Sequence, residues 1–252
     1  SQQGIDQLCA GLDEVLTIIQ DKEGYFWAGT FGQGLFQLDR NKKIIKSFHQ
    51  NASGKKTYVF CLLEDNEENI WYGTILNGLY KYNKKTGAVK NYSPANSSLA
   101  SNGISFLYQD DEDNIWAGTY AMGLFKYDKN KDDFFDISLD KKSGLKISDK
   151  GVTSIFSDSR GNLWIGTESN GLESYVKKTG KLINYKASSG KKGGLSHNHI
   201  IPIYEDSKGN LWVGTYSGGL NKFDYNTGTF TYYTITEGLP NNSIFSIIED
   251  DA

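Results

Sequence analysis

The 252-residue sequence is poor in several residue types. It has no apolar run near the roughly 20 residues that a membrane-spanning helix needs, and no segment at its start that resembles a signal peptide. We therefore expect a soluble protein, a mature fragment or an excised ectodomain. Three prolines leave no Pro-rich linker, and two cysteines say little about redox compartment. Cys61 lies in an apolar run and is interpreted as a small buried hydrophobe rather than half of a bridge to Cys9.

The charge composition gives little indication of a nucleic-acid partner. The formal net charge is −3, and residues of both signs are interspersed. Lysines cluster in pairs, mostly within Asn-, Gly- and Ser-rich segments, as is typical of solvated hairpin tips. Nucleic-acid binding usually needs a basic face, so we expect none here. A composition of 13% aromatic residues and 28 glycines suits an all-β protein.

A fifteen-residue pattern dominates the sequence and occurs five times without a gap, at residues 21–35, 65–79, 110–124, 158–172 and 206–220. Two clear copies read DSRGNLWIGTESNGL and DSKGNLWVGTYSGGL. All five tryptophans occupy the same position in it, at successive separations of 44, 45, 48 and 48 residues. A fixed period of this length, built on strand-like units, indicates a solenoid or a propeller.

Each repeat resolves into four short strands. An apolar run precedes the pattern, at residues 14–20, 57–64, 104–109, 152–157 and 200–205. Such a run predicts a first strand buried on both faces, which we place innermost along a central channel. A turn opened by Asp leads to a W-x-G-T strand, Gly-Leu opens an alternating third strand, and a more polar fourth strand follows, as at residues 133–138 and 230–235. Four antiparallel strands per repeat predict an all-β fold, a β-propeller.

Two details of the pattern predict local geometry. Glu68 and Asp113 replace the turn glycine in the second and third copies, so those turns should be less favourable. The glycine two residues after each tryptophan should let an adjacent sheet approach closely.

The repeats predict one propeller domain over residues 1–252, divided near 11–56, 57–102, 103–150, 151–197 and 198–242, with a partial repeat at 243–252. That gives five complete blades and one strand of a sixth, since residues 242–250 copy a first strand and the turn aspartate. Our hypothesis is that this is a piece of a longer propeller, or that two chains complete each other by self-association through the incomplete edges.

Units of the form I-x-D-x-x-G-N-L-W-I-G-T-x-x-x-G-L resemble the two-component regulator propeller repeat. The segments GLSHNHI at 194–200 and GLPNNSI at 238–244 fit the residues that precede such units. The resemblance covers residues 11–250. It implies the periplasmic sensor half of a hybrid two-component histidine kinase, in which seven-bladed propellers commonly sense oligosaccharides and control polysaccharide-utilisation genes. This chain has too few repeats for one such ring, and it contains no membrane helix, kinase or receiver segment.

Propellers usually bind ligands at the channel mouth, where the connections between second and third strands meet the loops before the first strands. Those connections vary among the five repeats, while the flanking Thr and Gly-Leu do not. Aromatic rings suit the apolar faces of sugars, and amides and carboxylates suit their hydroxyls. The candidate ligand-binding residues are Phe31, Gln33, Asn77, Tyr120, Glu168, Asn170, Tyr216, His197 and His199. The alternative is that these loop residues are simply solvated.

Metal and catalytic sites are weakly indicated. His197 and His199 form an H-x-H pair that a metal ion could join, but the third histidine is distant in the sequence and no cysteine or paired carboxylate is nearby. We predict no metal and no cofactor. The pattern aspartates at 21, 65, 110, 158 and 206 resemble the Asp-box turns of sialidases. Five equivalent copies favour a structural role, because an active site needs unique residues.

The sequence thus favours a non-enzymatic module that recognises an oligosaccharide or another small ligand, located in the periplasm by resemblance. Two alternatives stay open: a small propeller enzyme, such as a lyase or glycosidase, and a purely structural interaction scaffold.

Overall fold

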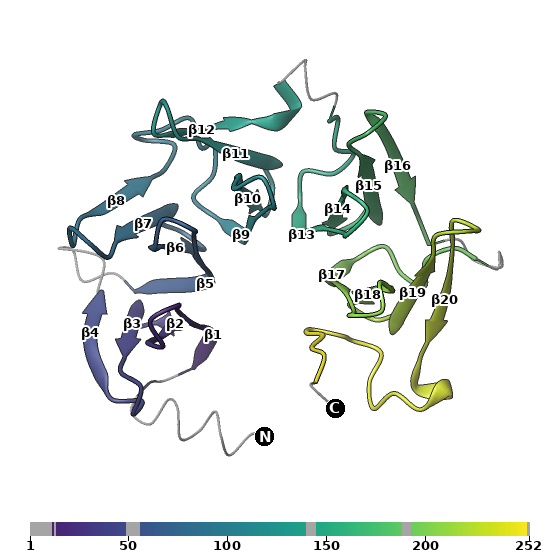
Figure 1. Cartoon of the computed structure of the whole chain (residues 1–252), viewed down its shortest axis with the longest axis horizontal. Helices are drawn as coiled ribbons and strands as arrows, with labels where there is room; N and C mark the ends of the chain where they lie inside the picture. The colour runs from purple at the N-terminus through teal and green to yellow at the C-terminus, as the bar shows by residue number, and fades with distance from the viewer. Residues whose placement is uncertain (1–11, 13, 49–55, 140–144, 188–192, 251–252) are drawn as a thin grey trace. The chain divides into compact units, whose positions relative to one another are not determined.

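The computed structural model describes residues 12, 14–48, 56–139, 145–187 and 193–250. The chain divides into two compact units, the first comprising Ser1–Ala117 and Lys126–Phe135, and the second Gly118–Phe125 and Asp136–Ala252. The regular structure of the described residues is β-strand, apart from two single-turn 3-10 helices, η1 (Ile137–Leu139) and η2 (Ile235–Glu237) (Figure 1). In these ranges no helix has the length and apolar character needed to cross a membrane.

The first and second strands of each repeat form where the sequence predicts them. The first strands are β1 (Val15–Gln20), β5 (Thr57–Glu64), β9 (Ile104–Gln109), β13 (Val152–Ser157) and β17 (Ile200–Glu205). The W-x-G-T strands are β2 (Phe26–Gly32), β6 (Asn69–Thr74), β10 (Ile115–Thr119), β14 (Asn162–Thr167) and β18 (Leu211–Thr215). Every first strand pairs antiparallel with the W-x-G-T strand of its own repeat.

The third strands open at the Gly-Leu leucine, as β3 (Leu35–Leu38), β7 (Leu79–Asn83), β11 (Leu124–Asp128), β15 (Leu172–Val176) and β19 (Leu220–Asp224). The fourth strands are β4 (Ile44–Phe48), β8 (Val89–Tyr92), β12 (Asp133–Asp136), β16 (Lys181–Tyr185) and β20 (Thr229–Tyr233). Two fourth strands end earlier than the sequence indicates. After β12, the Asp136 carboxylate accepts hydrogen bonds from the Ser138 amide and hydroxyl, and this turn leads into η1.

The strands form four-stranded antiparallel sheets, the blades of a β-propeller, and the all-β prediction is confirmed. Three sheets are separate, with the orders β12-β11-β10-β9, β13-β14-β15-β16 and β17-β18-β19-β20. The first two repeats differ, because Phe31 and Gly32 of β2 pair with Tyr58 and Thr57 of β5 and so link two blades into one eight-stranded sheet. Residues 242–250 contain no assigned strand, so the single strand of a sixth blade does not form.

The pattern aspartate connects the turn to the tryptophan. In the fourth repeat one Asp158 oxygen accepts hydrogen bonds from the amides of Arg160 and Asn162, at 3.0 and 2.8 Å. Its other oxygen accepts the indole N–H of Trp164 at 2.7 Å. The indole-to-aspartate bond recurs in all five repeats at 2.7–2.9 Å. A carboxylate whose two oxygens already accept these hydrogen bonds has a structural role, as the repetition predicts.

Two glycines of the pattern are required by close contacts. A Cβ on Gly166 would lie 2.8 Å from Ile200 of the next repeat, so glycine permits the sheets to approach. Gly171, which precedes β15, has a φ of +86° and would place a Cβ 2.1 Å from the Tyr185 carbonyl oxygen. The predicted close approach beside the tryptophan is confirmed, and it recurs at Gly29, Gly73 and Gly214.

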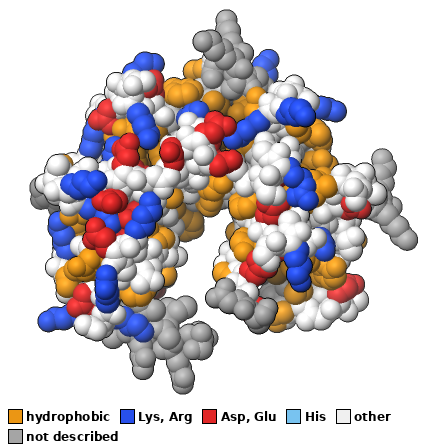
Figure 2. All heavy atoms as spheres, in the orientation of Figure 1, with side chains coloured by type: hydrophobic (Ala, Val, Ile, Leu, Met, Phe, Trp, Pro, Cys, Tyr) orange, Lys and Arg blue, Asp and Glu red, His pale blue; other side chains and the backbone are white. Residues whose placement is uncertain are grey.

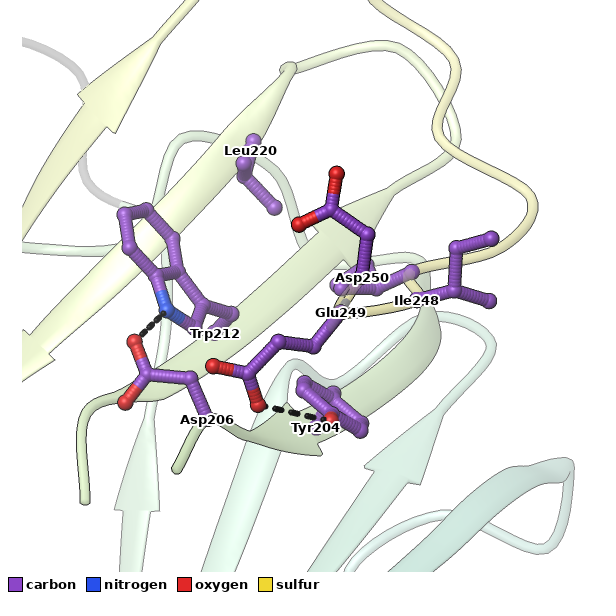
Figure 3. Close-up of a pocket in the computed structure, with 8 residues that line it drawn as sticks. Tyr204, Asp206, Trp212, Leu220, Ile248, Glu249 and Asp250 are labelled. Atoms are coloured by element: carbon purple, nitrogen blue, oxygen red, sulfur yellow. Dashed lines mark hydrogen bonds between the residues drawn. The ribbon is translucent and has the colours of Figure 1, made fainter. Parts of the chain in front are cut away.

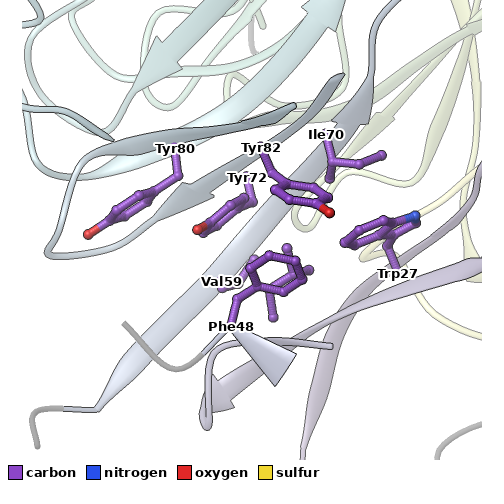
Figure 4. Packing of buried hydrophobic residues seen from close by; sticks show 8 residues of the cluster. Trp27, Phe48, Val59, Ile70, Tyr72, Tyr80 and Tyr82 are labelled. Carbon is purple, nitrogen blue, oxygen red and sulfur yellow. The ribbon is translucent and has the colours of Figure 1, made fainter. Parts of the chain in front are cut away.

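Buried aromatic residues fill the contacts between neighbouring sheets within each unit. In the first unit Trp27 and Phe48 pack against Tyr72 and Tyr82 of the next sheet (Figure 4). In the second unit Trp164 packs against Phe223 with ring centroids 5.0 Å apart. Burial of this kind removes large apolar areas from water and is the main stabilising contribution.

Cys61 lies in this interior, as the sequence predicts. Its side chain is buried, and burial raises the pKa of the thiol to about 12 because the thiolate would lose its hydration. Cys9 lies outside the described residues.

Charged side chains of both signs are interspersed on the face shown in Figure 2. One lysine of the predicted solvated pairs is nevertheless buried. The Lys84 ammonium lies 3.2 Å from Asp21 and 2.6 Å from Glu64, and all three side chains are at most 8% exposed. The prediction of a solvated hairpin tip is wrong for this residue, because the tip of the second sheet reaches the turn of the first.

The two turns that lack glycine have the strained geometry that the sequence indicates. Glu68 and Asp113 have φ values of 65° and 62°, where the equivalent Gly161 and Gly209 have 79° and 74°. We expect Glu68→Gly to raise the free energy of unfolding by about 0.5–1 kcal/mol, since left-handed backbone costs a residue with a Cβ more than glycine. Urea denaturation should show this gain. The control Glu67→Gly, at a residue without a positive φ, should be neutral or destabilising; a gain there too would contradict the explanation.

Candidate ligand-binding surface

In the connection between the second and third strands, the first residue is an exposed aromatic in three of the five repeats. Phe31, Tyr120 and Tyr216 occupy the first position and are 48%, 40% and 51% exposed. The hydroxyl of the pattern threonine accepts the amide N–H of the third residue. The same hydroxyl donates to the backbone carbonyl of the glycine that follows the third residue. This arrangement recurs at Gln33, Asn77, Met122, Asn170 and Gly218.

Exposed rings meet at the fifth repeat in the second unit. The imidazole of His199, in the loop before β17, stacks on Tyr216 with centroids 5.2 Å apart and an interplanar angle of 19°. The Tyr216 amide donates to the His199 carbonyl at 3.0 Å. Phe245 makes a T-shaped contact with Tyr216, with ring centroids 6.4 Å apart, and is 69% exposed. These contacts hold the Tyr216 ring as a half-exposed platform.

Glu168 and Tyr120 continue this surface across two further repeats of the same unit. The Glu168 amide donates to the Gly151 carbonyl at 2.9 Å. A Cβ on Gly151 would lie 2.9 Å from the Glu168 carboxylate and 3.2 Å from the Tyr120 carbonyl. The close approach of residues 120, 151 and 168 therefore requires glycine at position 151. The exposed Glu168 carboxylate acts to raise the pKa of His199. We name Tyr120, Glu168, His199, Tyr216 and Phe245 the mouth surface.

The two histidines have different roles. The Nδ1 of His197 accepts the His199 amide at 3.0 Å, which fixes the loop and occupies one ring nitrogen. The pKa of His199 is lowered by burial and by the neighbouring His197, although Glu168 opposes the shift. His199 is therefore a neutral ring near pH 7 and suits stacking. Among the described residues no group of three His, Cys, Asp or Glu side chains is placed to hold a metal ion.

Asn170 takes part in a polar cluster with Ser148 and Asn184, whose side chains are exposed. Its side-chain amide donates to the Ser148 hydroxyl, and its carbonyl accepts from Asn184 at 3.2 Å. Behind them Glu173 of β15 is fully buried and accepts the Ser148 amide at 2.9 Å and the Asn184 amide at 3.2 Å. Asn221 takes the equivalent position in the fifth repeat and accepts the Ser196 amide. This cluster holds the loop that leads to Gly151.

The remaining candidates belong to the first unit. Phe31 lies at the end of β2 and packs edge-on against Tyr58 at 4.7 Å. Gln33 forms a bridge with Thr57, and the Asn77 carbonyl accepts from Asn91 at 2.9 Å. Only Phe31 of these three has a strongly exposed side chain.

Two residues of this surface were missed by sequence reasoning. Phe245 belongs to the partial repeat, where it takes the position of Phe60, which is also exposed at 42%. The signal was its place in a first-strand copy, at the position that Phe60 holds in the second repeat. Gly151 precedes β13 and had no distinguishing pattern, because its role depends on the neighbouring repeat.

The pattern aspartates make the stability of the fold depend on pH. Burial alone would raise the pKa of Asp206, but hydrogen bonds from the Trp212 indole and from Asn210 outweigh it and lower the pKa to about 2. An unfolded aspartate has a pKa of about 3.9. The carboxylate therefore adds stability that is complete above pH ~4 and is lost as the pH falls toward 2.

We expect Asp206→Asn to lower the melting temperature at pH 7 and to flatten its decline between pH 4 and 2. Thermal unfolding across that range, monitored by circular dichroism, checks this prediction. Parallel pH curves for the variant and the wild type would contradict it.

Comparisons with known proteins agree with the repeats. The family model described as two component regulator propeller matches residues 98–121, 146–169 and 194–217. Each match ends in the connection after a W-x-G-T strand, so each spans a loop, a first strand and the pattern. The chain therefore carries two component regulator propeller repeats, and the predicted resemblance is confirmed. A comparison with curated proteins found no match.

Solved structures with this fold include extracellular domains. The extracellular domain of a hybrid two component system from B. thetaiotaomicron is 25% identical, with a TM-score of 0.70, over 87% of this chain and 30% of that one. PorZ, a surface component of the type-IX secretion system of Porphyromonas gingivalis, is 17% identical with a TM-score of 0.72, over 96% and 38%. Virginiamycin B lyase from Staphylococcus aureus is 15% identical with a TM-score of 0.65, over 87% and 69%. The last two show the fold alone.

The chain thus resembles the extracellular sensor domains of hybrid two-component systems. It spans about 30% of the length of the first of these structures.

Proposed function

We propose that this chain is a non-enzymatic ligand-recognition module that works outside the cytoplasm, in the periplasm, and binds an oligosaccharide at the mouth surface. The observation that supports it most is the Tyr216 platform, a half-exposed ring stacked on a neutral imidazole and flanked by Phe245. Apolar faces of pyranose rings stack on such platforms. The Glu168 carboxylate lies within the same surface as an acceptor for sugar hydroxyls.

A surface made by several repeats suits an extended ligand. Tyr120, Glu168 and Tyr216 come from the third, fourth and fifth repeats, so a linear sugar could contact each in turn. Bound in this way, the ligand would restrain neighbouring blades, and a partner could sense that restraint. The resemblance to extracellular sensor domains supports this role.

The experiment is binding of the full chain to a glycan array, followed by calorimetric titration of the best oligosaccharide. The triple variant Tyr120→Ala, Glu168→Gln, Tyr216→Ala should lose binding, while its free energy of unfolding stays within about 0.5 kcal/mol per substitution because the side chains are exposed. Tyr232→Ala, an exposed aromatic on the fourth strand β20 of the same unit, is the matched control and should retain binding. An unchanged affinity of the triple variant would contradict the proposal.

The enzyme alternative is tested in the same samples. Reducing-end and mass-spectrometric assays after long incubation should detect no shortened or unsaturated sugar. Release of such products would favour a lyase or glycosidase over a recognition module.

A further inference from the structure

The first residue of the connection between second and third strands is acidic in one repeat only. The other four repeats have an aromatic or aliphatic residue there: Phe31, Ile75, Tyr120 and Tyr216. The fourth repeat has Glu168, and its side chain is exposed. The threonine before the connection and the glycine after it are the same in all five repeats. The fold therefore accepts an apolar side chain at this position, and the carboxylate needs another explanation.

The backbone of Glu168 is fixed, while its charge is free to pair with a ligand. Its amide donates to the Gly151 carbonyl at 2.9 Å. The amide and hydroxyl of the next residue, Ser169, both donate to Asp149, at 2.9 and 2.7 Å. Within the described ranges the Glu168 carboxylate itself has no hydrogen-bond or ion-pair partner. An exposed carboxylate in a fixed position forms strong bonds with a cationic donor from outside the chain.

A second carboxylate lies in the adjoining loop. Asp149 also accepts the Gly151 amide at 3.0 Å. Burial would raise the pKa of Asp149, but the hydrogen bonds from Gly151 and Ser169 outweigh it and lower the pKa below its ordinary value. Asp149 is therefore an anion near pH 7, and its field adds to that of Glu168.

The neighbouring bases do not offset these charges. Burial, followed by the neighbouring His197, lowers the pKa of His199, so that this ring is neutral near pH 7. Lys150 lies between Asp149 and Gly151 in the sequence, is exposed, and forms no ion pair with either carboxylate in the described part of the chain. The mouth surface thus carries a net negative charge at pH 7.

Exposed tyrosine rings lie in the repeats on both sides of Glu168. The Tyr120 carbonyl and the Glu168 carboxylate both approach Gly151, and Tyr216 stacks on His199 with centroids 5.2 Å apart. The faces of such rings attract cations as well as apolar C–H groups. A ligand that matches this surface combines an apolar ring face with a positive charge, as a protonated amino sugar does.

We propose that the mouth surface selects oligosaccharides with free amino groups, so that the ammonium of one sugar pairs with Glu168 while a neighbouring sugar stacks on Tyr216. This inference rests on the proposed function and narrows its ligand class. Asp149 strengthens the attraction from behind, because its oxygens already accept hydrogen bonds. Oligosaccharides of uronic acids have the same sign of charge as the surface and are repelled.

The test is calorimetric titration of the full chain with tetramers of glucosamine, N-acetylglucosamine and galacturonic acid. It is run at about pH 6, where the sugar amines are protonated. The glucosamine tetramer should bind about three- to fivefold more tightly than its N-acetylated form, as expected for one exposed ion pair. The galacturonic acid tetramer should bind most weakly. Raising the salt concentration from about 0.01 to 1 M should remove these differences by screening.

Glu168→Gln should abolish the preference for the glucosamine tetramer and change the affinity for the N-acetylated tetramer by less than about twofold. Asp250→Asn is the matched control, because it also removes one exposed carboxylate from the same unit. Asp250 lines a cavity of about 450 Å³ with Asp206 and Trp212, at the turn end of the fifth sheet, whereas Tyr216 follows the opposite end of β18 (Figure 3). The preference should persist in the control, and both variants should melt at the wild-type temperature.

Two results would overturn this inference while oligosaccharide recognition stands: equal affinity for the glucosamine and N-acetylglucosamine tetramers, or a preference that survives Glu168→Gln. The inference alone also fails if none of the tetramers binds but the glycan array identifies another oligosaccharide. If no glycan binds at all, the proposed function fails with it. Tetralysine is the last probe, since it carries ammonium groups without sugar rings. Binding of tetralysine as tight as that of the glucosamine tetramer would show recognition of bare charge and would overturn the inference.

Discussion

Trp71→Ala should lower the free energy of unfolding by about 3–5 kcal/mol, the usual cost of truncating a buried large aromatic residue. Trp71 is 0% exposed and lies within 4.9–6.0 Å of the rings of Tyr92, Tyr127 and Phe134. Its indole also donates to Asp65 at 2.7 Å, so the truncation leaves a buried carboxylate oxygen with one partner fewer. Both losses act in the same direction.

The matched control is Trp212→Ala, which removes the same side chain from the same position of the pattern. Trp212 is half-buried and has only Tyr233 of its own sheet as an aromatic neighbour in the described residues. We expect roughly half the loss, in proportion to the apolar area that leaves water. Urea denaturation monitored by circular dichroism measures both values. Equal losses would mean that burial between sheets is not what stabilises the repeats.

Lys84→Met should destabilise the protein by about 3–5 kcal/mol, because it leaves buried carboxylates without their cation. Lys84 bonds to Asp21 and Glu64, and Glu64 in turn accepts the Lys22 amide at 2.8 Å. Mutual repulsion of the two carboxylates adds to the cost once the ammonium is gone.

The neighbouring Lys85 provides a stringent control for this variant. Its side chain is 69% exposed and pairs with Glu68 at 3.4 Å on the surface. Lys85→Met should change the free energy of unfolding by no more than about 0.5 kcal/mol. If the two methionine variants denature at the same urea concentration, the buried ion cluster is not a stabilising element.

The repeat pattern predicts the strands well, because each strand depends on local information. The apolar runs at 57–64, 104–109, 152–157 and 200–205 became strands with those same limits. The turns were predictable too, since aspartate, glycine and tryptophan recur at fixed spacing. The pattern also indicated where glycine was missing, and Glu68 has the positive φ that follows.

Features that depend on a neighbouring repeat were not predictable. Lys84 looked like a solvated lysine because nothing near it in sequence shows that Asp21 and Glu64 meet it. The pairing of β2 with β5 depends on how two sheets approach one another. At the mouth surface, the bonds of Asn170 to Ser148 and Asn184 were not predictable, because those residues lie far from it in the sequence.

The central claim is that Trp27, Trp71 and Trp164 are each covered by the following blade of the same unit, while Trp212 is only half-buried. Labelling the chain with 5-fluorotryptophan gives one fluorine NMR signal for each of the five tryptophans, assigned by single Trp→Phe variants. We predict that the Trp212 signal shifts between H₂O and D₂O and broadens with a paramagnetic relaxation agent more than the signals of Trp27, Trp71 and Trp164 do. Equal protection of all five signals, or exposure of Trp27, Trp71 or Trp164, would contradict the account.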